Sequence, residues 1–378
     1  MIKSKKGLYL HIPFCVKKCN YCDFLSAPAA EEDRKAYAAC LKKEILAYRS
    51  AEYEADTVFF GGGTPSLLSA NSIKELMQTL HTAFIIEETA EITMECNPET
   101  VDKEKLCAMR KAGINRISFG LQSAVDRELA LLGRIHNYER FLRAYYDARE
   151  AGFENISIDL MSAIPEQTES SWEETLKKVI DLKPEHISAY SLIIEEGTVF
   201  YDRQKELMLP DEDTERQMYH RTKELLQNAG YARYEISNYA RPGFESRHNL
   251  KYWSGAEYIG MGQGASSLLG GIRFHNPYDG RRYRESCENL TALRCEEERL
   301  TKTAQMEEFC FLGLRRMKGI SEEEFRELFG RKLAEVYPGV VEGFVEQGLL
   351  AKQGEWIFLT EKGTDVSNRI FAEFLLDE

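Results

Sequence analysis

Short apolar runs alternate with longer segments of helical spacing along the first half of the chain. The runs are rich in β-branched and aromatic residues and predict six strands, at residues 8–14, 57–60, 90–96, 116–121, 156–161 and 186–194. Between them, apolar residues recur every three or four positions, which predicts helices at 31–53, 72–84, 103–112, 126–152 and 172–182. Strands that alternate with helices form a parallel sheet with helical crossovers. Eight such units close a full barrel, so six predict an open, partial (β/α)6 barrel of the α/β class.

The pattern changes after residue 210. A helix is predicted at 213–228 and a strand at 234–239. Further helices, at 305–317, 321–329 and 333–347, precede an apolar hairpin that turns at Gln353-Gly354. Helices followed by a hairpin are typical of a winged-helix-like α+β module. We therefore expect a partial barrel with the cofactor sites (1–210), an extension that closes the barrel (211–298) and a C-terminal winged-helix-like domain (299–378).

Composition and charge exclude several classes of protein. Hydrophobic residues make up 43% of the 378 residues, enough for a sizeable core. No stretch approaches the roughly 18 apolar residues of a membrane span, and the first apolar run stops at Pro13, too early for a signal peptide. The net charge is −13 and no basic stripe is present, so nucleic acid is not an expected partner. The nine cysteines are an odd number without pair spacing beyond residue 22, which argues against a disulfide framework and predicts a reduced, cytoplasmic protein.

Cys15, Cys19 and Cys22 lie within eight residues, directly after the first predicted strand. Thiolates at this spacing select an iron–sulfur cluster or zinc. A structural zinc site needs a fourth ligand, which His11 could supply, and a buried, inert trio of cysteines is the third alternative. Three thiols without a nearby fourth suit an iron–sulfur cluster in which one iron stays open.

Polar or glycine residues follow the successive predicted strands. They are the run Gly61-Gly62-Gly63-Thr64, then Glu95, Gln122 and Asp159. Each could be only a turn or a helix cap. Together they fall at the carboxyl ends of parallel strands, the face on which barrel proteins build their active sites. Glycine lets the backbone approach a ligand closely, and no GKS or GKT follows the run, which excludes a P-loop.

The segment HIPFCxxxCxxC resembles the radical S-adenosylmethionine (SAM) superfamily. Over essentially the whole chain, LYLHIPFC, CDF, FFGGGTPS, ITMECNPE, RISFGLQS and IDLMSAIP resemble the group of oxygen-independent coproporphyrinogen III oxidase and the HemW-type haem chaperones. The resemblance implies a partial barrel of radical SAM type. It also implies that Cys15, Cys19 and Cys22 hold a [4Fe–4S] cluster whose open iron binds SAM and delivers the electron that splits it.

The resemblance further implies contacts with SAM. The glycine loop, with Gly62, Gly63 and Thr64, is expected to bond the methionine amino group. The SAM on the open iron would contact Tyr9, Gly62 and Glu95. The positions that hold a second SAM in the oxidase are matched here by Tyr21, Gly63, Thr64, Gln122, Arg134, Asp159 and Ile193.

Three features separate the chain from the oxidase. Phe24 stands where the oxidase has a fourth cysteine, and only fourteen residues precede Cys15 where the oxidase has a long extension. The segment His248-Asn249-x-x-Tyr252-Trp253 resembles the HNxxYW motif typical of the chaperone branch. Imidazole is the usual axial ligand of haem, so His248 is a candidate haem contact; the alternative is a hydrogen-bonded structural histidine.

These features predict a radical-SAM-type haem chaperone with a [4Fe–4S] cluster, SAM and haem as cofactors. The alternatives are a coproporphyrinogen III oxidase, which converts two propionates to vinyls, and a zinc-stabilised scaffold; whether the chain catalyses a reaction stays open. The expected partners are haem and an apoprotein that accepts it. A second copy of the chain in a homodimer is an open alternative, and membrane contact is expected only peripherally, through the acceptor.

Overall fold

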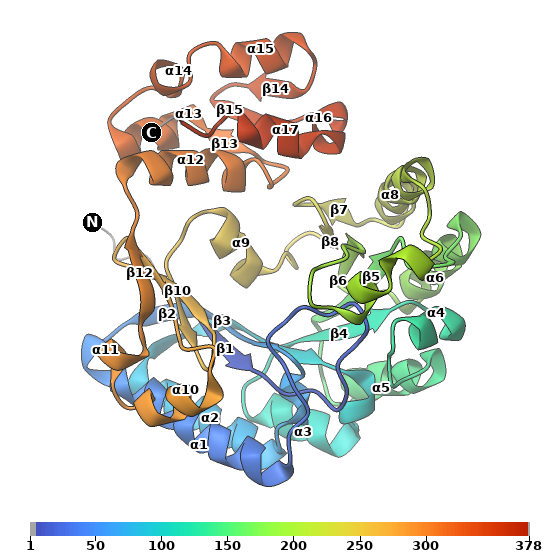
Figure 1. The fold of residues 1–378 in the computed structure, drawn as a ribbon, viewed down its shortest axis with the longest axis vertical. Coiled ribbons are helices and arrows are strands. Elements are labelled where there is room, and N and C mark those ends of the chain that lie inside the picture. The colour runs from blue at the N-terminus through green and yellow to red at the C-terminus, as the bar shows by residue number, and fades with distance from the viewer. Residues whose placement is uncertain (1–4, 377–378) are drawn as a thin grey trace.

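The structure, a computed structural model, describes residues 5–376 and confirms the open α/β barrel. Six parallel strands lie side by side in chain order (Figure 1). They are β1 (Lys6–Ile12), β2 (Glu54–Gly62), β3 (Ile85–Cys96), β4 (Arg116–Gln122), β5 (Ile156–Ser162) and β6 (His186–Ser191). Because the strands are parallel, their carboxyl ends meet at one edge of the sheet, where the predicted site residues lie.

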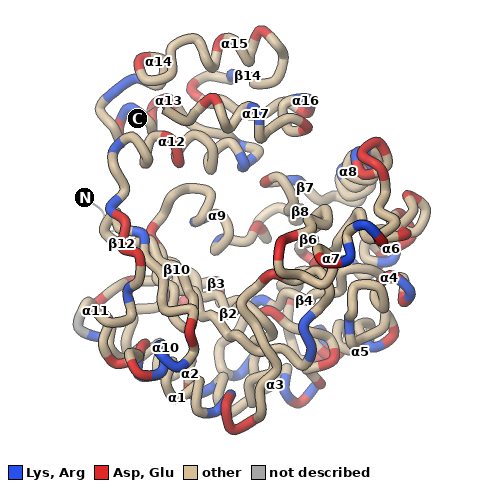
Figure 2. Tube along the Cα trace, in the orientation of Figure 1, with Lys and Arg blue, Asp and Glu red and all other residues tan. Residues whose placement is uncertain are grey.

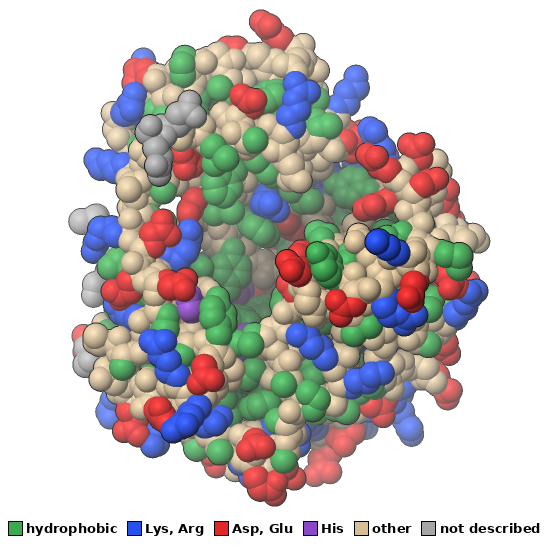
Figure 3. Space-filling model, viewed as in Figure 1, with side chains coloured by type: hydrophobic (Ala, Val, Ile, Leu, Met, Phe, Trp, Pro, Cys, Tyr) green, Lys and Arg blue, Asp and Glu red, His purple; other side chains and the backbone are tan. Residues whose placement is uncertain are grey.

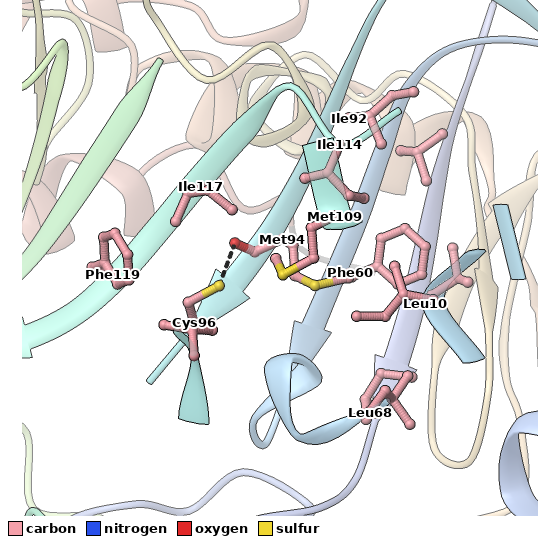
Figure 4. Packing of buried hydrophobic residues seen from close by; sticks show 14 of the residues in the cluster. Leu10, Phe60, Leu68, Ile92, Met94, Cys96, Met109, Ile114, Ile117 and Phe119 are labelled. Carbon is pink, nitrogen blue, oxygen red and sulfur yellow. Dashed lines mark hydrogen bonds between the residues drawn. The ribbon is translucent and has the colours of Figure 1, made fainter. Parts of the chain in front are cut away.

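Alternation along each strand separates the apolar core from the barrel interior. Phe60, Met94 and Ile117 are fully buried on the side of the helices, and Figure 4 shows Met109 packed between them. Burial of a side chain of this size contributes about 1.5–3 kcal/mol to folding. The intervening residues, such as Glu95 and Ser118, line the interior cavities. The sheet therefore has one apolar face and one polar face.

Crossover helices cover the apolar face and lie outside the curved sheet in Figure 1. They are α1 (Glu31–Ala47), α2 (Ala70–Ala83), α3 (Lys103–Lys111), α4 (Asp126–Leu131), α5 (Tyr138–Glu150) and α6 (Glu169–Leu182). Side-chain caps define several helix starts: Asp102 accepts the N–H of Lys105 at 2.8 Å, and Asn137 that of Arg140 at 2.9 Å. Four short 3₁₀ turns lie among these elements, η1 (Arg49–Ala51), η2 (Pro65–Leu67), η3 (Pro98–Thr100) and η4 (Gln204–Glu206).

Six further short strands, none of which the sequence pattern predicted with these bounds, extend the sheet to twelve strands. Beside β1 lie β9 (Tyr258–Met261), β10 (Ser266–Leu269), β11 (Ile272–His275) and β12 (Cys295–Arg299); beside β6 lie β8 (Asn238–Ala240) and β7 (Ala232–Arg233). The predicted strand at 234–239 is therefore wrong, because the chain turns there between β7 and β8. The helices of this region are α7 (Val199–Asp202), α8 (Glu212–Asn228), α9 (Arg247–Trp253), α10 (Gly280–Ser286) and α11 (Leu290–Leu293).

The expectation of unpaired cysteines is also corrected. Cys40 on α1 and Cys287, directly after α10, form a disulfide with their Cα atoms 5.9 Å apart. The two residues are 247 positions apart, so no local spacing could reveal the pair. One turn after Cys40 and one turn before Cys287, the hydroxyl of Tyr283 donates a hydrogen bond to Glu44. The barrel extension is thus attached to α1 at two points.

The C-terminal residues form an apolar cluster of their own. Their elements are α12 (Lys302–Gly313), β13 (Ile320–Ser321), α13 (Glu322–Phe329), α14 (Leu333–Val336), α15 (Val340–Glu346), β14 (Leu350–Gln353), β15 (Trp356–Leu359), α16 (Glu361–Asp365) and α17 (Ser367–Ala372). The hairpin turns where expected, and the winged-helix-like arrangement of helices and a small sheet is confirmed. The single helix predicted at 333–347 is broken into α14 and α15, since Pro338-Gly339 cannot continue it.

Charges of both signs are interspersed along the C-terminal elements in Figure 2, with no continuous basic stripe on the face shown. Among residues 5–376, no helix is both long and apolar enough to cross a membrane.

Candidate metal and cofactor site

The cysteine loop begins where β1 ends and is held over the carboxyl edge of the sheet. Phe14 pairs with Ala27 across the base of the loop, and the N–H of Cys15 donates to the carbonyl of Ala27 at 3.1 Å. Further along, the N–H of Asn20 donates to the carbonyl of Leu132 at 2.9 Å. The contacts with Ala27 close the base of the loop, and the bond to Leu132 anchors it between Cys19 and Cys22.

All three thiols line one cavity of about 150 Å³. Thr64 Oγ1 lies 3.5 Å from the sulfur of Cys15, and Arg134 Nη1 lies 3.5 Å from that of Cys19. Burial raises the pKa of Cys22 to about 11, so a bound cation is needed to hold it as a thiolate. Each thiolate of a [4Fe–4S] cluster binds a different iron, so the sulfurs need to share a cavity rather than one point. The donor set fits such a cluster.

The zinc alternative, by contrast, is not supported by the position of His11. Its Nε2 lies 2.9 Å from the carbonyl of Leu25 and its Nδ1 lies 3.0 Å from the hydroxyl of Tyr9. Both nitrogens are therefore engaged. Within residues 5–376, no three His, Cys, Asp or Glu side chains are placed to hold a single metal ion.

The glycine run at the end of β2 permits a close approach that larger residues would block. Gly62 has φ of +112°, and a Cβ there would lie 2.6 Å from the ring of His11. A Cβ on Gly63 would lie 2.7 Å from the carbonyl oxygen of Phe14. The N–H of Gly63 instead donates to the carbonyl of Ile12 at 2.9 Å. The glycines thus bring the ends of β1 and β2 together beside the thiols.

Two carboxylates, Glu95 on β3 and Asp159 on β5, face the interior. Burial and the negative charge of Asp159 raise the pKa of Glu95 to about 8. Burial also raises the pKa of Asp159, although Ser118 Oγ donates to its carboxylate at 2.9 Å. Glu95 is therefore largely protonated at neutral pH in the protein without ligands.

Gln122 ends β4 in a left-handed conformation with φ of +74°, which is rare for a residue other than glycine. The register between β4 and β5 shifts at this point, and the guanidinium of Arg134 donates to the carbonyl of Gly120 at 2.6 Å. Strained backbone of this kind is concentrated at functional sites. The irregular strand end turns Gln122 toward the same cavity as the cysteines.

The structure brings most of the predicted residues together. The first cavity is lined by Cys15, Cys19, Cys22, Tyr21, Gly62, Gly63, Thr64, Glu95, Gln122, Arg134 and Asp159. A second cavity of about 390 Å³ shares several of these residues and adds Ile193. The space-filling view also shows the molecule hollowed between the barrel and the C-terminal elements (Figure 3). Tyr9 lines neither cavity; its ring packs closely against Gly61, and its hydroxyl lies 3.0 Å from His11 Nδ1.

His248, the candidate haem contact, lies away from both cavities. The ring is 1% exposed and lines neither cavity. Its Nδ1 lies 2.8 Å from Thr57 Oγ1 and its Nε2 lies 3.0 Å from the hydroxyl of Tyr252. Both nitrogens are engaged, which favours the alternative of a hydrogen-bonded structural histidine in this conformation.

The sequence argument missed the polar residues that lie deeper in the barrel. They include Arg116, Ser118, His186, Ser188, Tyr190 and Asn249, all of which line the second cavity. A signal was present on β4 and β6, where polar residues at every second position interrupt buried apolar ones. Such alternation inside a predicted parallel barrel indicates a polar interior.

Two family models match the chain: the radical SAM superfamily at residues 9–179 and the HemN C-terminal domain at residues 300–366. Over 380 residues the chain is 37% identical to a protein named heme chaperone HemW from Lactococcus lactis subsp. lactis (strain IL1403), with 100% of this chain and 99% of the relative covered. A protein of the same name from Bacillus subtilis (strain 168) is 36% identical, with 98% of this chain and 99% of the relative covered.

A solved structure, coproporphyrinogen III oxidase (HemN) from Escherichia coli, described as a radical SAM enzyme, has the same fold. Its TM-score is 0.87 at 23% identity, with 98% of this chain and 90% of that chain covered. At this identity the likeness concerns the fold alone. The relatives that are more than 30% identical over nearly their whole length also identify the family of this chain. The chain belongs to the HemW family within the radical SAM superfamily.

Proposed function

We propose that this protein is a haem chaperone that binds a [4Fe–4S] cluster and SAM and delivers haem to an apoprotein. The observation that carries the proposal is that the three thiols, the glycine run and Glu95 line one cavity in a chain whose full-length relatives are named heme chaperones. Cys15, Cys19 and Cys22 would hold the cluster. When bound, the cluster supplies the electron for radical SAM chemistry.

The residues around the thiols are suited to this task. The guanidinium of Arg134, beside the sulfur of Cys19, offsets part of the negative charge of the thiolates. The polar backbone at Gly62 and Gly63, together with Glu95, offers hydrogen bonds to the amino acid part of SAM beside the thiols. Gln122 and Asp159 offer further polar contacts in the same cavity.

The rim of the cavities is suited to a flat apolar ligand. Phe24 and Ile193 are 62% and 68% exposed, and both line the second cavity. Large exposed apolar side chains around a concave site are typical of surfaces that bind a ligand or a partner. Phe24 supports the chaperone rather than the oxidase, because the ring cannot replace the additional cysteine of the oxidase motif. We infer that haem docks at this rim and leaves by it toward the acceptor.

The proposal is tested with protein purified and reconstituted without oxygen. Iron, acid-labile sulfide and haem are measured on one sample, and haem titration is followed by the Soret band. We expect saturable haem binding and no formation of protoporphyrinogen IX from coproporphyrinogen III with SAM and a reductant. Protoporphyrinogen IX formation without saturable haem binding would instead identify an oxidase.

A further inference from the structure

Arg116, the first residue of β4, is a buried cation with no hydrogen-bond or ion-pair partner among residues 5–376, although its charge acts at longer range on Glu95 and Asp159. Its side chain is 2% exposed, and its Nε atom is buried with no hydrogen-bond partner. Among residues 5–376, its guanidinium forms neither an ion pair nor a side-chain hydrogen bond. Burial of an unpaired charge is costly, so buried arginines are normally paired. The missing partner is expected to come from outside the chain.

The guanidinium lines the second cavity, the one of about 390 Å³. Two other buried polar groups in this cavity, His186 and Asp159, already have partners. Nδ1 of His186 lies 2.8 Å from Ser157 Oγ, and its Nε2 lies 2.8 Å from the hydroxyl of Tyr234. Asp159 accepts hydrogen bonds from Ser118 and Ser157. These hydrogen bonds do not involve Arg116, so its guanidinium is the charged donor in this cavity that can bind a ligand.

Charge and geometry point to the chemical class of that ligand. A guanidinium presents parallel N–H groups that match the two oxygens of a carboxylate. Asp159 lines the same cavity, so a phosphate with two negative charges would be repelled more strongly than a carboxylate, whose single charge matches that of one arginine. Arg116 does not line the first cavity, where the three thiols lie together, so the carboxylate belongs to a part of the ligand away from them.

We propose that the second cavity is a carboxylate-binding site in which Arg116 pairs with a carboxylate of the bound ligand. This inference rests on the proposed function, whose ligands carry such groups. The carboxylate could belong to either of two ligands: a haem whose propionate extends into the barrel, or a SAM molecule whose methionine part lies in this cavity. The chemistry is the same for both, and the experiment distinguishes them.

The experiment compares each ligand with its uncharged analogue by titration of the reconstituted protein. Haem is paired with haem dimethyl ester, and SAM with its carboxamide. In the wild type, the ligand whose carboxylate meets Arg116 should bind about tenfold to hundredfold more tightly than its analogue. The ratio should fall to near one in Arg116→Gln. Arg116→Lys keeps the charge but loses the parallel geometry, so it should retain only part of the ratio.

Lys318→Gln is the matched control, because Lys318 lies in a separate groove with three other basic residues and does not line the second cavity. It should leave both ratios at their wild-type values, and thermal melting establishes that each variant is folded. If Arg116→Gln does not fold, the comparison of wild type with Arg116→Lys decides.

The outcomes separate this inference from the proposed function. If the affinity ratio of haem to its dimethyl ester depends on Arg116, the carboxylate in the cavity is a haem propionate. If the affinity ratio of SAM to its carboxamide depends on Arg116, the carboxylate is that of the methionine part of SAM. Saturable haem binding by a wild type that binds each ligand and its uncharged analogue equally well would overturn the carboxylate site. The proposed haem chaperone function would be unaffected. If the protein does not bind haem, but its preference for SAM over the carboxamide is lost in Arg116→Gln, the chaperone function is overturned and the carboxylate site is supported.

Discussion

The backbone N–H of Gly62 donates a hydrogen bond of 3.1 Å to Oε2 of Glu95, which joins the carboxyl ends of β2 and β3 beside the thiols. The same carboxyl group lines both cavities. Replacing it should therefore remove a ligand contact and loosen the glycine run. We expect Glu95→Ala to weaken SAM binding by about tenfold or more, measured by calorimetry, with the iron content unchanged.

Glu99→Ala is the matched control for this prediction, because Glu99 lies on η3, is exposed and lines neither cavity. It should leave SAM affinity at the wild-type value. Equal SAM affinity in Glu95→Ala and the wild type would place the SAM site elsewhere. Loss of iron together with loss of SAM would show that Glu95 holds the cysteine loop rather than the ligand.

Replacing any one of Cys15, Cys19 and Cys22 with alanine should abolish the iron–sulfur cluster, because two thiolates leave a second iron without a protein ligand. Cys107→Ala is the control: this residue lies on α3 and lines neither cavity, so its loss should leave iron and sulfide at wild-type levels. Iron and acid-labile sulfide are measured after anaerobic reconstitution. Stoichiometric zinc without sulfide in the wild type would contradict the cluster.

The six parallel strands and the site at their carboxyl ends could be predicted because both depend on local patterns. Apolar runs define the strands, and parallel pairing then places Glu95 and Asp159 at the same edge without knowledge of any long-range contact. The strands β9 to β12 have four or five residues each and little alternation, so periodicity could not detect them.

Features that depend on distant pairing could not be predicted. The Cys40–Cys287 disulfide forms because the extension folds back on α1. The role of His248 depends on Thr57, which lies 191 positions away. Arg116 could have been noticed from its place in the polar alternation of β4, but its lack of a partner is visible only in three dimensions.

Glu44, which attaches α1 to the barrel extension, should make stability depend on pH. Its carboxylate accepts hydrogen bonds from the hydroxyl of Tyr283 at 2.7 Å, the N–H of Gly262 at 2.8 Å and the amide of Asn276 at 2.6 Å. Burial nevertheless raises its pKa from 4.5 to about 7. The folded state then binds more protons than the unfolded state between these values, so the free energy of unfolding decreases as pH rises from about 4.5 to 7.

The size of this effect follows from the shift. It corresponds to a loss on the order of 3 kcal/mol across that range. The measurement is urea unfolding of wild type and Glu44→Gln at pH 5 and pH 8. Gln lacks the titration, so it should lose less stability between the two pH values, although it is less stable than wild type at pH 5 because one donor loses its acceptor. Identical pH dependence in both proteins would show that Glu44 does not titrate in this range.

His248 should prove to be a stabilising core residue rather than a haem ligand. Its ring stacks on Phe59 with centroids 5.2 Å apart, and its nitrogens are paired with Thr57 and Tyr252. Burial, with a contribution from Lys251, lowers its pKa to about 3, so the ring is neutral near pH 7. His248→Ala leaves a cavity and two hydroxyls without their partner. We expect the free energy of unfolding to fall by about 2–4 kcal/mol, while folded protein binds haem with unchanged affinity.

Tyr252→Phe is the matched control, because it removes one hydrogen bond of His248 but keeps the packing. It should cost about 1 kcal/mol and also leave haem affinity unchanged. Urea unfolding and Soret titration are measured on the same preparations.

A second signature follows from the lowered pKa of His248. The stability contributed by His248 is present above about pH 6.5 and decreases as the pH falls below it, because the unfolded chain binds the proton that the buried ring does not. Loss of haem in His248→Ala with unchanged unfolding would instead show that the ring leaves its buried position to bind iron.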